Sequence, residues 1–294
     1  MNLQDELDQY WDKYYEDSGW APDPRSKFRG IRNTISEQSK DAADEHYERW
    51  RSIFEFVIEW LSYVHLALSK DEEAFPRNDE SRASWALIGA ATNFACSVRD
   101  TCIAGHETPS KALLRTLTET LYLCIAILYD EKLGLEYTQA QGEKKVKDFW
   151  HTSASPKNLH LKIIEIEKEF GLDQETIDVY TKYRMSDYEV MSQASHLSYE
   201  LACQTCLPEP IERAGVVAVG IWGRASNQVI FSLSKAARTI WYFSRLSYPR
   251  IMTLAAEEKR GLLDFDCKDE NHRAIDAGYK IYSHIIMENW NEKL

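Results

Sequence analysis

Large apolar residues recur at steps of three and four positions between residues 36 and 70, and this spacing is the feature that most constrains the fold. Residues so spaced lie on one face of an α-helix and can be buried together against neighbouring helices. The recurring positions are Trp50, Phe54, Val57 or Ile58, Leu61, Val64 or His65, and Leu68. The pattern predicts a long helix that packs against others.

The rest of the chain also favours helices. Only 12 glycines and 8 prolines occur in 294 residues, so the chain has few of the residues on which many short strands and turns depend. No segment alternates apolar and polar residues between turn residues as a strand does. Helices are predicted at about 3–17, 131–149, 157–170, 173–184 and 186–203. A long helical region is predicted from 207 to about 246, and an interruption at 247–249 separates it from a helix at about 250–260. A final helix is predicted from 272 to 290.

A segment rich in small residues, about 82–104, is predicted to be a central helix. Its small residues are Ala86, Gly89, Ala90, Ala91, Ala95 and Ala104. Small side chains allow a neighbouring helix to approach closely. Ser81 can cap the start of this helix, and Gly105 can end it.

The next helix, about 109–130, follows almost at once. Thr108 can cap it, and Pro109 suits its first turn. The short connection predicts that the two helices form an antiparallel hairpin at the centre of an all-α, multi-helix bundle. We expect an N-terminal segment and linker at 1–35, followed by a single large helical domain at 36–294.

The net charge of −12 limits the partners that the chain can bind. Affinity for nucleic-acid backbones comes mainly from Lys and Arg, so broad binding to nucleic acid is disfavoured. Anionic membrane surfaces are disfavoured for the same reason.

The composition also predicts where the protein resides. The most apolar stretches, 113–129 and 215–233, contain charged or strongly polar side chains where a membrane span would have none: Arg115, Glu119, Arg224, Asn227 and Gln228. The first residues lack the pattern of a signal peptide, and without export the six cysteines do not suggest disulfides. We therefore expect a cytoplasmic protein without a membrane segment.

Arg115 and Glu119 are the first candidate binding residues. They are four positions apart, so they share a helix face and can pair. The helix around them is apolar, so both charges are expected to be partly buried and to need partners. One interpretation is an internal ion pair that fixes helix packing. The other is a functional pocket, because buried titratable groups often collect at sites.

A second group of candidate binding residues, Ser192, His196 and Tyr199, follows at steps of four and three. A histidine on that face could bond Glu119 across the bundle and titrate near neutral pH. The alternative is a histidine satisfied within the core.

These two segments carry a resemblance to a known family. ALLRTLTETLYLCIAILYDE, which contains an L-L-R-x-L-x-E pattern, and the later SQASH resemble a family of bacterial helical-bundle proteins of unknown function. That family is distantly similar to the HEPN (higher eukaryotes and prokaryotes nucleotide-binding) bundles, which occur in defence and toxin systems. The resemblance covers about residues 50–205.

The HEPN resemblance implies one catalytic pair. HEPN ribonucleases carry an R-x4–6-H motif, and Arg99 followed by Asp100 and then His106 fits that spacing. In a metal-independent ribonuclease, His106 would handle the 2′-hydroxyl proton and Arg99 would steady the phosphate charge. Such an enzyme would act as a homodimer, and RNA is expected as a partner only under this hypothesis. Arg99 can as easily be a surface cation at the end of a helix, and His106 a loop residue.

No cofactor is indicated by the motifs. The chain has no paired Glu-x-x-His motif, phosphate-binding glycine loop, dinucleotide-binding glycine turn or nucleophile elbow. Cys203, Cys206, Cys267 and His272 together could form a four-ligand zinc site. The chain lacks a second closely spaced pair of ligands, which counts against such a site, so the sequence leaves the question undecided.

Three functions are consistent with these observations. The first is a helical bundle that binds a partner or ligand in a bacterial defence or stress system. The second is the dimeric ribonuclease. The third is a small-molecule sensor whose pocket contains Arg115, Glu119 and His196, and an apolar cavity beside these groups would favour it.

Overall fold

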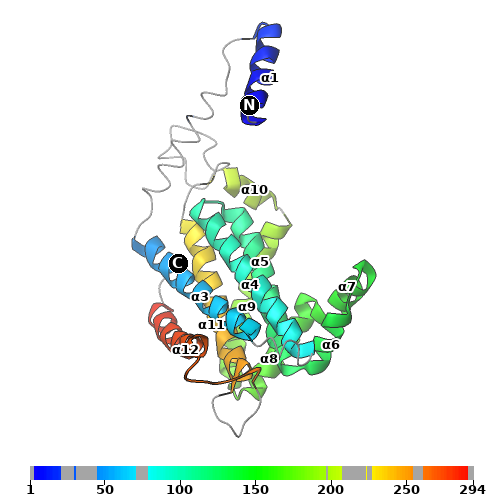
Figure 1. Ribbon diagram of the computed structural model, residues 1–294, viewed down its shortest axis with the longest axis vertical. Helices are drawn as coiled ribbons and strands as arrows, with labels where there is room; N and C mark the ends of the chain where they lie inside the picture. Colours follow the sequence, from blue (N-terminus) through cyan, green and yellow to red (C-terminus); the bar gives the residue numbers. More distant parts are fainter. Residues whose placement is uncertain are drawn as a thin grey trace.

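The structure is a computed structural model that describes residues 3–20, 30, 45–70, 79–196, 198–206, 223, 227–253 and 261–290. It confirms the all-α multi-helix bundle (Figure 1). The helices are α1 (Leu3–Asp17), α3 (Glu45–Lys70), α4 (Asp79–Ile103), α5 (Glu107–Tyr129), α6 (Glu131–Gln139), α7 (Glu143–Phe149), the π-helical turn η1 (Trp150–Ala154), α8 (Pro156–Glu169), α9 (Gln174–Ser195), α10 (Tyr199–Cys206), α11 (Asn227–Ile251) and α12 (Glu270–Asn289). Two short strands, β1 (Met252–Thr253) and β2 (Leu263–Asp264), pair in parallel.

The predicted central hairpin is formed by α4 and α5, which pack along each other. Gly105 ends α4 with a positive φ of 74°. The amide of His106 donates to the carbonyl of Thr101, which closes the last turn of α4. The two predicted N-terminal caps, Ser81 and Thr108, are wrong. Helix α4 starts before Ser81, and α5 starts before Thr108, whose hydroxyl instead bonds that of Thr205 in α10 at 2.5 Å.

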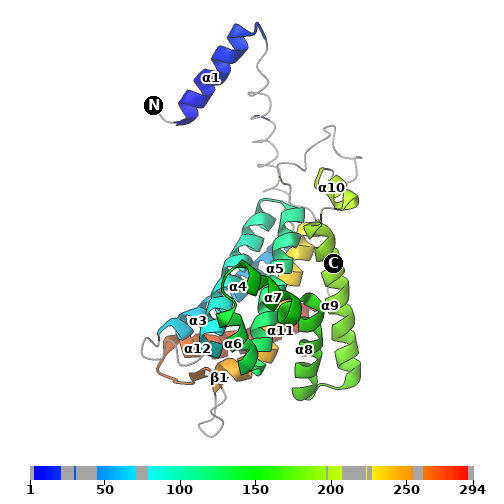
Figure 2. The same ribbon diagram turned by 90° about the vertical axis from the view of Figure 1, so that its right-hand side faces the viewer.

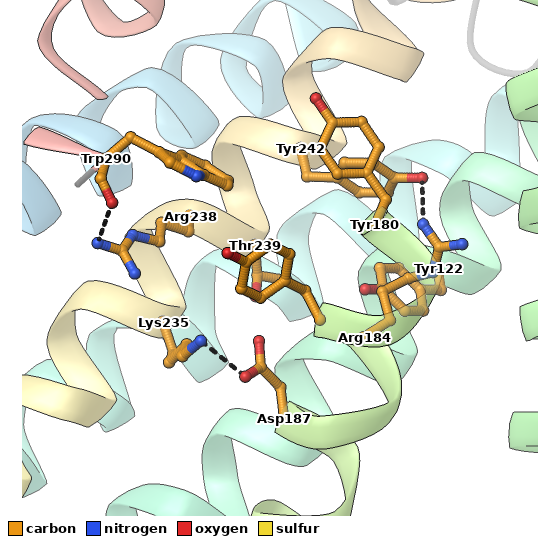
Figure 3. A pocket seen from close by; sticks show the side chains of 10 residues that line it. Tyr122, Tyr180, Arg184, Asp187, Lys235, Arg238, Thr239, Tyr242 and Trp290 are labelled. Carbon is orange, nitrogen blue, oxygen red and sulfur yellow. Dashed lines mark hydrogen bonds and ion pairs between the residues drawn. The ribbon is translucent and has the colours of Figure 1, made fainter. Parts of the chain in front are cut away.

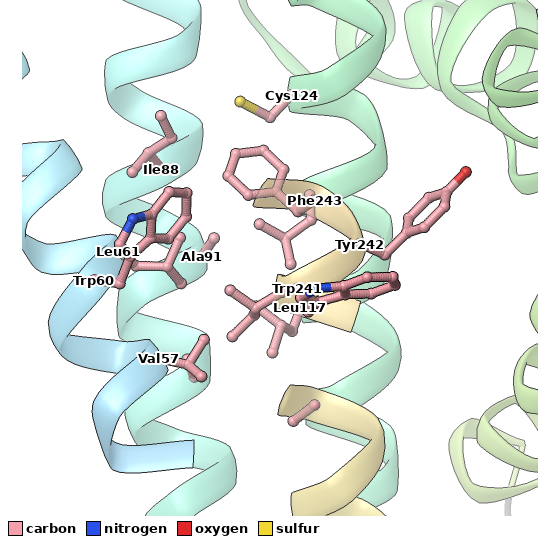
Figure 4. Close-up of a cluster of buried hydrophobic side chains, with 14 of the residues drawn as sticks. Val57, Trp60, Leu61, Ile88, Ala91, Leu117, Cys124, Trp241, Tyr242 and Phe243 are labelled. Atoms are coloured by element: carbon pink, nitrogen blue, oxygen red, sulfur yellow. The ribbon is translucent and has the colours of Figure 1, made fainter. Parts of the chain in front are cut away.

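The core lies where α3, α4, α5 and α11 meet (Figure 4). Its largest fully buried side chains come from all four helices, and they include Trp60 and Leu61 of α3, Ile88 of α4, Leu117 and Leu121 of α5, and Phe243 of α11. Burying each such side chain stabilises the fold by about 1.5–3 kcal/mol. The apolar face predicted between residues 50 and 68 is therefore the face that meets the bundle.

Helix α5 is central because both of its sides are covered. One side packs on α4 and α11, and the other packs on α8 and α9 (Figure 2). Of the described helices, α5 alone is long and apolar enough to cross a membrane, and 56% of its most apolar window is buried in the bundle. Burial against neighbouring helices accounts for its composition.

Three predicted boundaries differ from the structure. The segment 131–149 is divided between α6 and α7, because Gly142 takes a φ of 84°. Residues 174–195 form one continuous helix, α9, where we predicted a break near residue 185. Helix α11 continues through Pro249 to Ile251. A proline so close to a helix end removes few backbone hydrogen bonds, so the helix tolerates it.

The end of the chain departs from the prediction too. The helix predicted at 250–260 is wrong at residues 252–253, which form β1, and residues 254–260 lie outside the described part of the chain. At the other end, α1 confirms the helix predicted at 3–17 and stands away from the bundle in Figure 1. Most of the predicted linker, and the start of the helix predicted from residue 207, lie outside the described residues.

Candidate functional site

The predicted pair of Arg115 and Glu119 is present on α5, and a tyrosine of α9 completes it. Arg115 Nε donates to Glu119 Oε1 over 2.9 Å. The phenol oxygen of Tyr188 accepts from Arg115 Nη2 at 2.5 Å, and its hydroxyl donates to Glu119 Oε1 at 3.1 Å. The Arg115 and Glu119 side chains are 19% and 16% exposed. The two charges therefore pair and are largely buried, as the apolar surroundings predicted.

Electrostatics keep this cluster charged. Burial alone would lower the pKa of Arg115, but Glu119 and Tyr188 together outweigh that effect and the pKa is raised. Burial, together with the nearby charge of Glu119, raises the pKa of Tyr188, so its phenol stays protonated at neutral pH. The cluster fixes α9 against α5 through bonds whose donors and acceptors are matched.

A second buried cluster joins α8, α9 and α11. Arg184 of α9 makes a bidentate ion pair with Glu167 of α8, with Nη1–Oε1 and Nη2–Oε2 distances of 2.5 and 3.0 Å. Tyr242 of α11 accepts from Arg184 at 2.9 Å and donates to Glu167 at 2.5 Å. The Arg184 and Glu167 side chains are only 7% and 0% exposed. Sequence reasoning missed these residues, because they come from three helices and share no local spacing.

A cavity of about 590 Å³ lies between α5, α8 and α9 and reaches both clusters. Its volume is typical of small-molecule sites, which span roughly 300–1,000 Å³. The wall is mainly carbon, from the side chains of Leu159, Met185 and Pro156 and the rings of Tyr122 and Tyr188. The other lining residues are Thr118, Glu119, Lys157, His160, Arg184, Ser186 and Glu189.

The buried charges beside this cavity have ion-pair partners, whereas Lys157 and Glu189 of its wall are exposed. Glu119 is paired with Arg115, and Arg184 is paired with Glu167. His160 is half-buried, and burial lowers its pKa, as does the nearby Arg184. The imidazole is therefore neutral at pH 7, with one nitrogen that donates and one that accepts a hydrogen bond. The cavity thus offers an apolar wall and neutral hydrogen-bonding groups.

The predicted site residues of α9 and α10 are only partly brought together. Ser192 is half-buried, one turn beyond Tyr188. His196 forms the C-terminal cap of α9 and is exposed. It lies eight residues beyond Tyr188, which is roughly 12 Å along a helix. The side chain that bonds Glu119 from α9 is Tyr188, where we expected His196. Tyr199 is 86% exposed on α10.

The pair implied by the HEPN resemblance has separate neighbours. Arg99 of α4 bonds Asp100 at 2.8 Å and Glu55 of α3 at 3.2 Å. These two carboxylates raise its pKa, with Asp100 contributing most. His106 lies at the turn into α5, and its ring occupies the space that a Cβ atom on residue 223, a glycine, would need. Their catalytic role stays a prediction.

The residues considered above for a zinc site lie on different elements of the fold. Cys203 lies in α10 and Cys267 in the loop before α12, and both are free thiols. The Nδ1 atom of His272 accepts from the amide of Asp266 at 3.1 Å. The Cys206 side chain lies outside the described residues. Within the described part, no three His, Cys, Asp or Glu side chains form a metal-binding group.

Comparison with known proteins adds no relative to this picture. No protein-family model, no curated protein and no solved structure matches the chain.

Proposed function

We propose that this protein binds a small, uncharged and mainly apolar molecule in the cavity between α5, α8 and α9. The observation that carries the proposal is an apolar space of about 590 Å³ beside the polar cluster of Arg115, Glu119 and Tyr188. A ligand with an apolar body would cover the carbon wall of this space, which is otherwise open to water, and would gain contacts with it. This proposal corresponds to the sensor interpretation of the sequence.

The wall of the cavity indicates the chemistry of the ligand. An ionised ligand would find no unpaired charge in the buried part of the cavity, because Glu119 and Arg184 already have partners. The other two charges of the wall, Lys157 and Glu189, are exposed to solvent. An apolar body would contact Leu159 and Met185. A single hydroxyl, carbonyl or amide group could bond the neutral imidazole of His160. The ligand class is therefore a neutral apolar compound with one hydrogen-bonding group.

The test uses the full chain and N-phenyl-1-naphthylamine, a neutral apolar dye that fluoresces strongly when it leaves water. We expect saturable binding with one site per chain. Ser186→Trp places an indole at an exposed position that lines the cavity. Lys182→Trp is the matched control, one turn earlier on α9, exposed and outside the cavity wall.

We expect Ser186→Trp to weaken dye binding at least tenfold, and Lys182→Trp to leave it within twofold. Far-ultraviolet circular dichroism would establish that both variants keep their helices. The proposal is refuted if the parent protein shows no saturable binding, or if the two tryptophan variants bind the dye equally well.

A further inference from the structure

The wall of the cavity between α5, α8 and α9 contains a carboxylate oxygen that the protein leaves unused, the Oε2 atom of Glu119. The two hydrogen bonds that hold Glu119 in its cluster both end on the other oxygen. Arg115 Nε donates to Oε1 at 2.9 Å, and the hydroxyl of Tyr188 donates to Oε1 at 3.1 Å. Within the described part of the chain, no donor bonds Oε2.

This oxygen is accessible to a molecule in the cavity. Glu119 lines the cavity, and its side chain is 16% exposed. The side-chain nitrogens and oxygens of the described residues that are both buried and without a partner belong to other residues. Since Oε2 lacks a partner and is not among those buried atoms, its surface is open, and a ligand in the cavity can reach it.

The polar groups beside Glu119 are largely used by the protein itself. The hydroxyl of Tyr188 gives its hydrogen to Oε1. The hydroxyl of Thr118 donates to a backbone carbonyl of its own helix at 2.8 Å. Arg184 turns toward α11, where its Nη1 atom donates to the hydroxyl of Tyr242 at 2.9 Å (Figure 3). Oε2 therefore keeps a free position for a hydrogen-bond donor among neighbours that are already bonded.

The chemistry of a carboxylate decides which ligand group suits this position. An ionised carboxylate only accepts hydrogen bonds, and a bond to it is roughly twice as strong as one between neutral groups. A carbonyl or ether oxygen of a ligand would face Oε2 without a hydrogen between them. A cation would lose hydration for little gain, because Arg115 already balances the charge of Glu119. The matching group is a neutral donor.

We propose that Glu119 selects the ligand of this cavity, and that the ligand is a neutral apolar compound whose hydroxyl or N–H group donates to Oε2. The inference rests on the proposed function and narrows its ligand class, from compounds with any one hydrogen-bonding group to compounds that donate. Glu119 is then a specificity-determining residue, in addition to its place in the cluster with Arg115 and Tyr188.

The experiment compares 1-naphthol with 1-methoxynaphthalene as competitors of N-phenyl-1-naphthylamine on the full chain. Both are neutral at pH 7 and share one ring system, but the ether lacks the hydroxyl hydrogen. Its added methyl group increases the apolar surface, so without a role for the donor the ether should bind at least as tightly as the alcohol. The preference is the ratio of the two dissociation constants.

Glu119→Gln is the decisive variant. Arg115 and Tyr188 both donate to Oε1, so the amide oxygen of glutamine takes that place and its NH₂ group replaces Oε2. Glu189→Gln is the matched control, because it makes the same change at an exposed carboxylate of the same wall. His160→Phe removes the other acceptor of the wall and gives a second measurement, which decides the question if circular dichroism shows that Glu119→Gln has lost its helices.

We expect the parent protein to bind 1-naphthol about tenfold more tightly than the ether. Glu119→Gln should reduce this preference below twofold, whereas Glu189→Gln and His160→Phe should keep it within twofold of the parent value. Absence of dye binding would refute the proposed function and this inference together. If the dye binds but the parent does not discriminate between the two competitors, only the inference fails. It also fails if Glu119→Gln retains the preference or His160→Phe abolishes it, because another acceptor would then be responsible.

Discussion

Removing one charge from the ion pair of Arg184 and Glu167 should destabilise this bundle more than removing one charge from a more exposed pair. Replacing Glu167 by Gln keeps the size of the side chain but leaves the guanidinium, 7% exposed, without its countercharge. The variant loses a bidentate interaction at 2.5 and 3.0 Å and weakens the acceptor for Tyr242. Leaving one charge of a buried pair uncompensated typically costs about 3–5 kcal/mol.

That cost should be readily measured. For a chain of this size, a change of about 1 kcal/mol shifts the melting temperature by roughly 2–4 °C, so Glu167→Gln should lower it by about 6–20 °C. Urea unfolding followed by tryptophan fluorescence gives the free energy of unfolding directly. Replacing both partners, as Glu167→Leu with Arg184→Met, removes the pair and its desolvation cost together. We expect this double variant to unfold at a free energy within about 2 kcal/mol of the parent protein.

Two results would refute the reasoning. If Glu167→Gln lowers the free energy of unfolding by less than about 1 kcal/mol, the Arg184 guanidinium is solvated by water or paired with another group, and it is not a buried, uncompensated charge. If the double variant is less stable than either single variant, the pair contributes more than its desolvation costs. Glu119→Gln serves as a comparison, because the Arg115–Glu119 pair is more exposed and its loss should be milder.

Other substitutions test further parts of the fold. Burial and the charge of Glu131 raise the pKa of Glu80 to about 7, so its contribution to stability is full below about pH 4.5 and is lost as the pH rises through about 7. Glu80→Gln should therefore raise the free energy of unfolding by about 1–2 kcal/mol at pH 8, after allowance for partial exposure, and change it little at pH 4.5, as urea titrations at the two pH values would show. Gly278→Ala places a methyl group 2.8 Å from Trp60 Cδ1. We expect the free energy of unfolding, measured by thermal unfolding, to fall by about 1–3 kcal/mol, whereas a rise would mean that α12 and α3 separate easily. Gly105→Val should destabilise the hairpin more than Gly105→Asn, because φ is 74° there and asparagine tolerates that region better; equal melting temperatures would contradict this.

Much of the fold could be predicted from local pattern alone. The recurrence from Trp50 to Leu68 predicted the buried face of α3. The small residues of 82–104 predicted a central helix, and the short connection after Gly105 predicted the α4–α5 hairpin. Pairing of Arg115 and Glu119 followed from their spacing on one helix. Helix ends were less predictable, because a cap depends on where the chain turns and not only on which residue is present.

The partners across the bundle could not be predicted. We expected His196 to meet Glu119, but the side chain that reaches it is Tyr188, two turns earlier on α9. The offset between α5 and α9 decides which residue faces which, and no local spacing encodes that offset. The cavity arises in the same way, since it is bounded by residues from α5, α8 and α9.

By itself, the sequence determined that this chain forms amphipathic helices, that residues from about 109 to 130 form a buried one, and that the charges within it must find partners. Helix formation and the cost of burying charge are local properties. Only the tertiary structure decided that Tyr188 joins Arg115, that Glu167 and Tyr242 join Arg184, and that packing leaves an apolar cavity beside α9. The physical reason is that packing between helices depends on the shapes of side chains far apart in the chain, which fix the offset of one helix against the next.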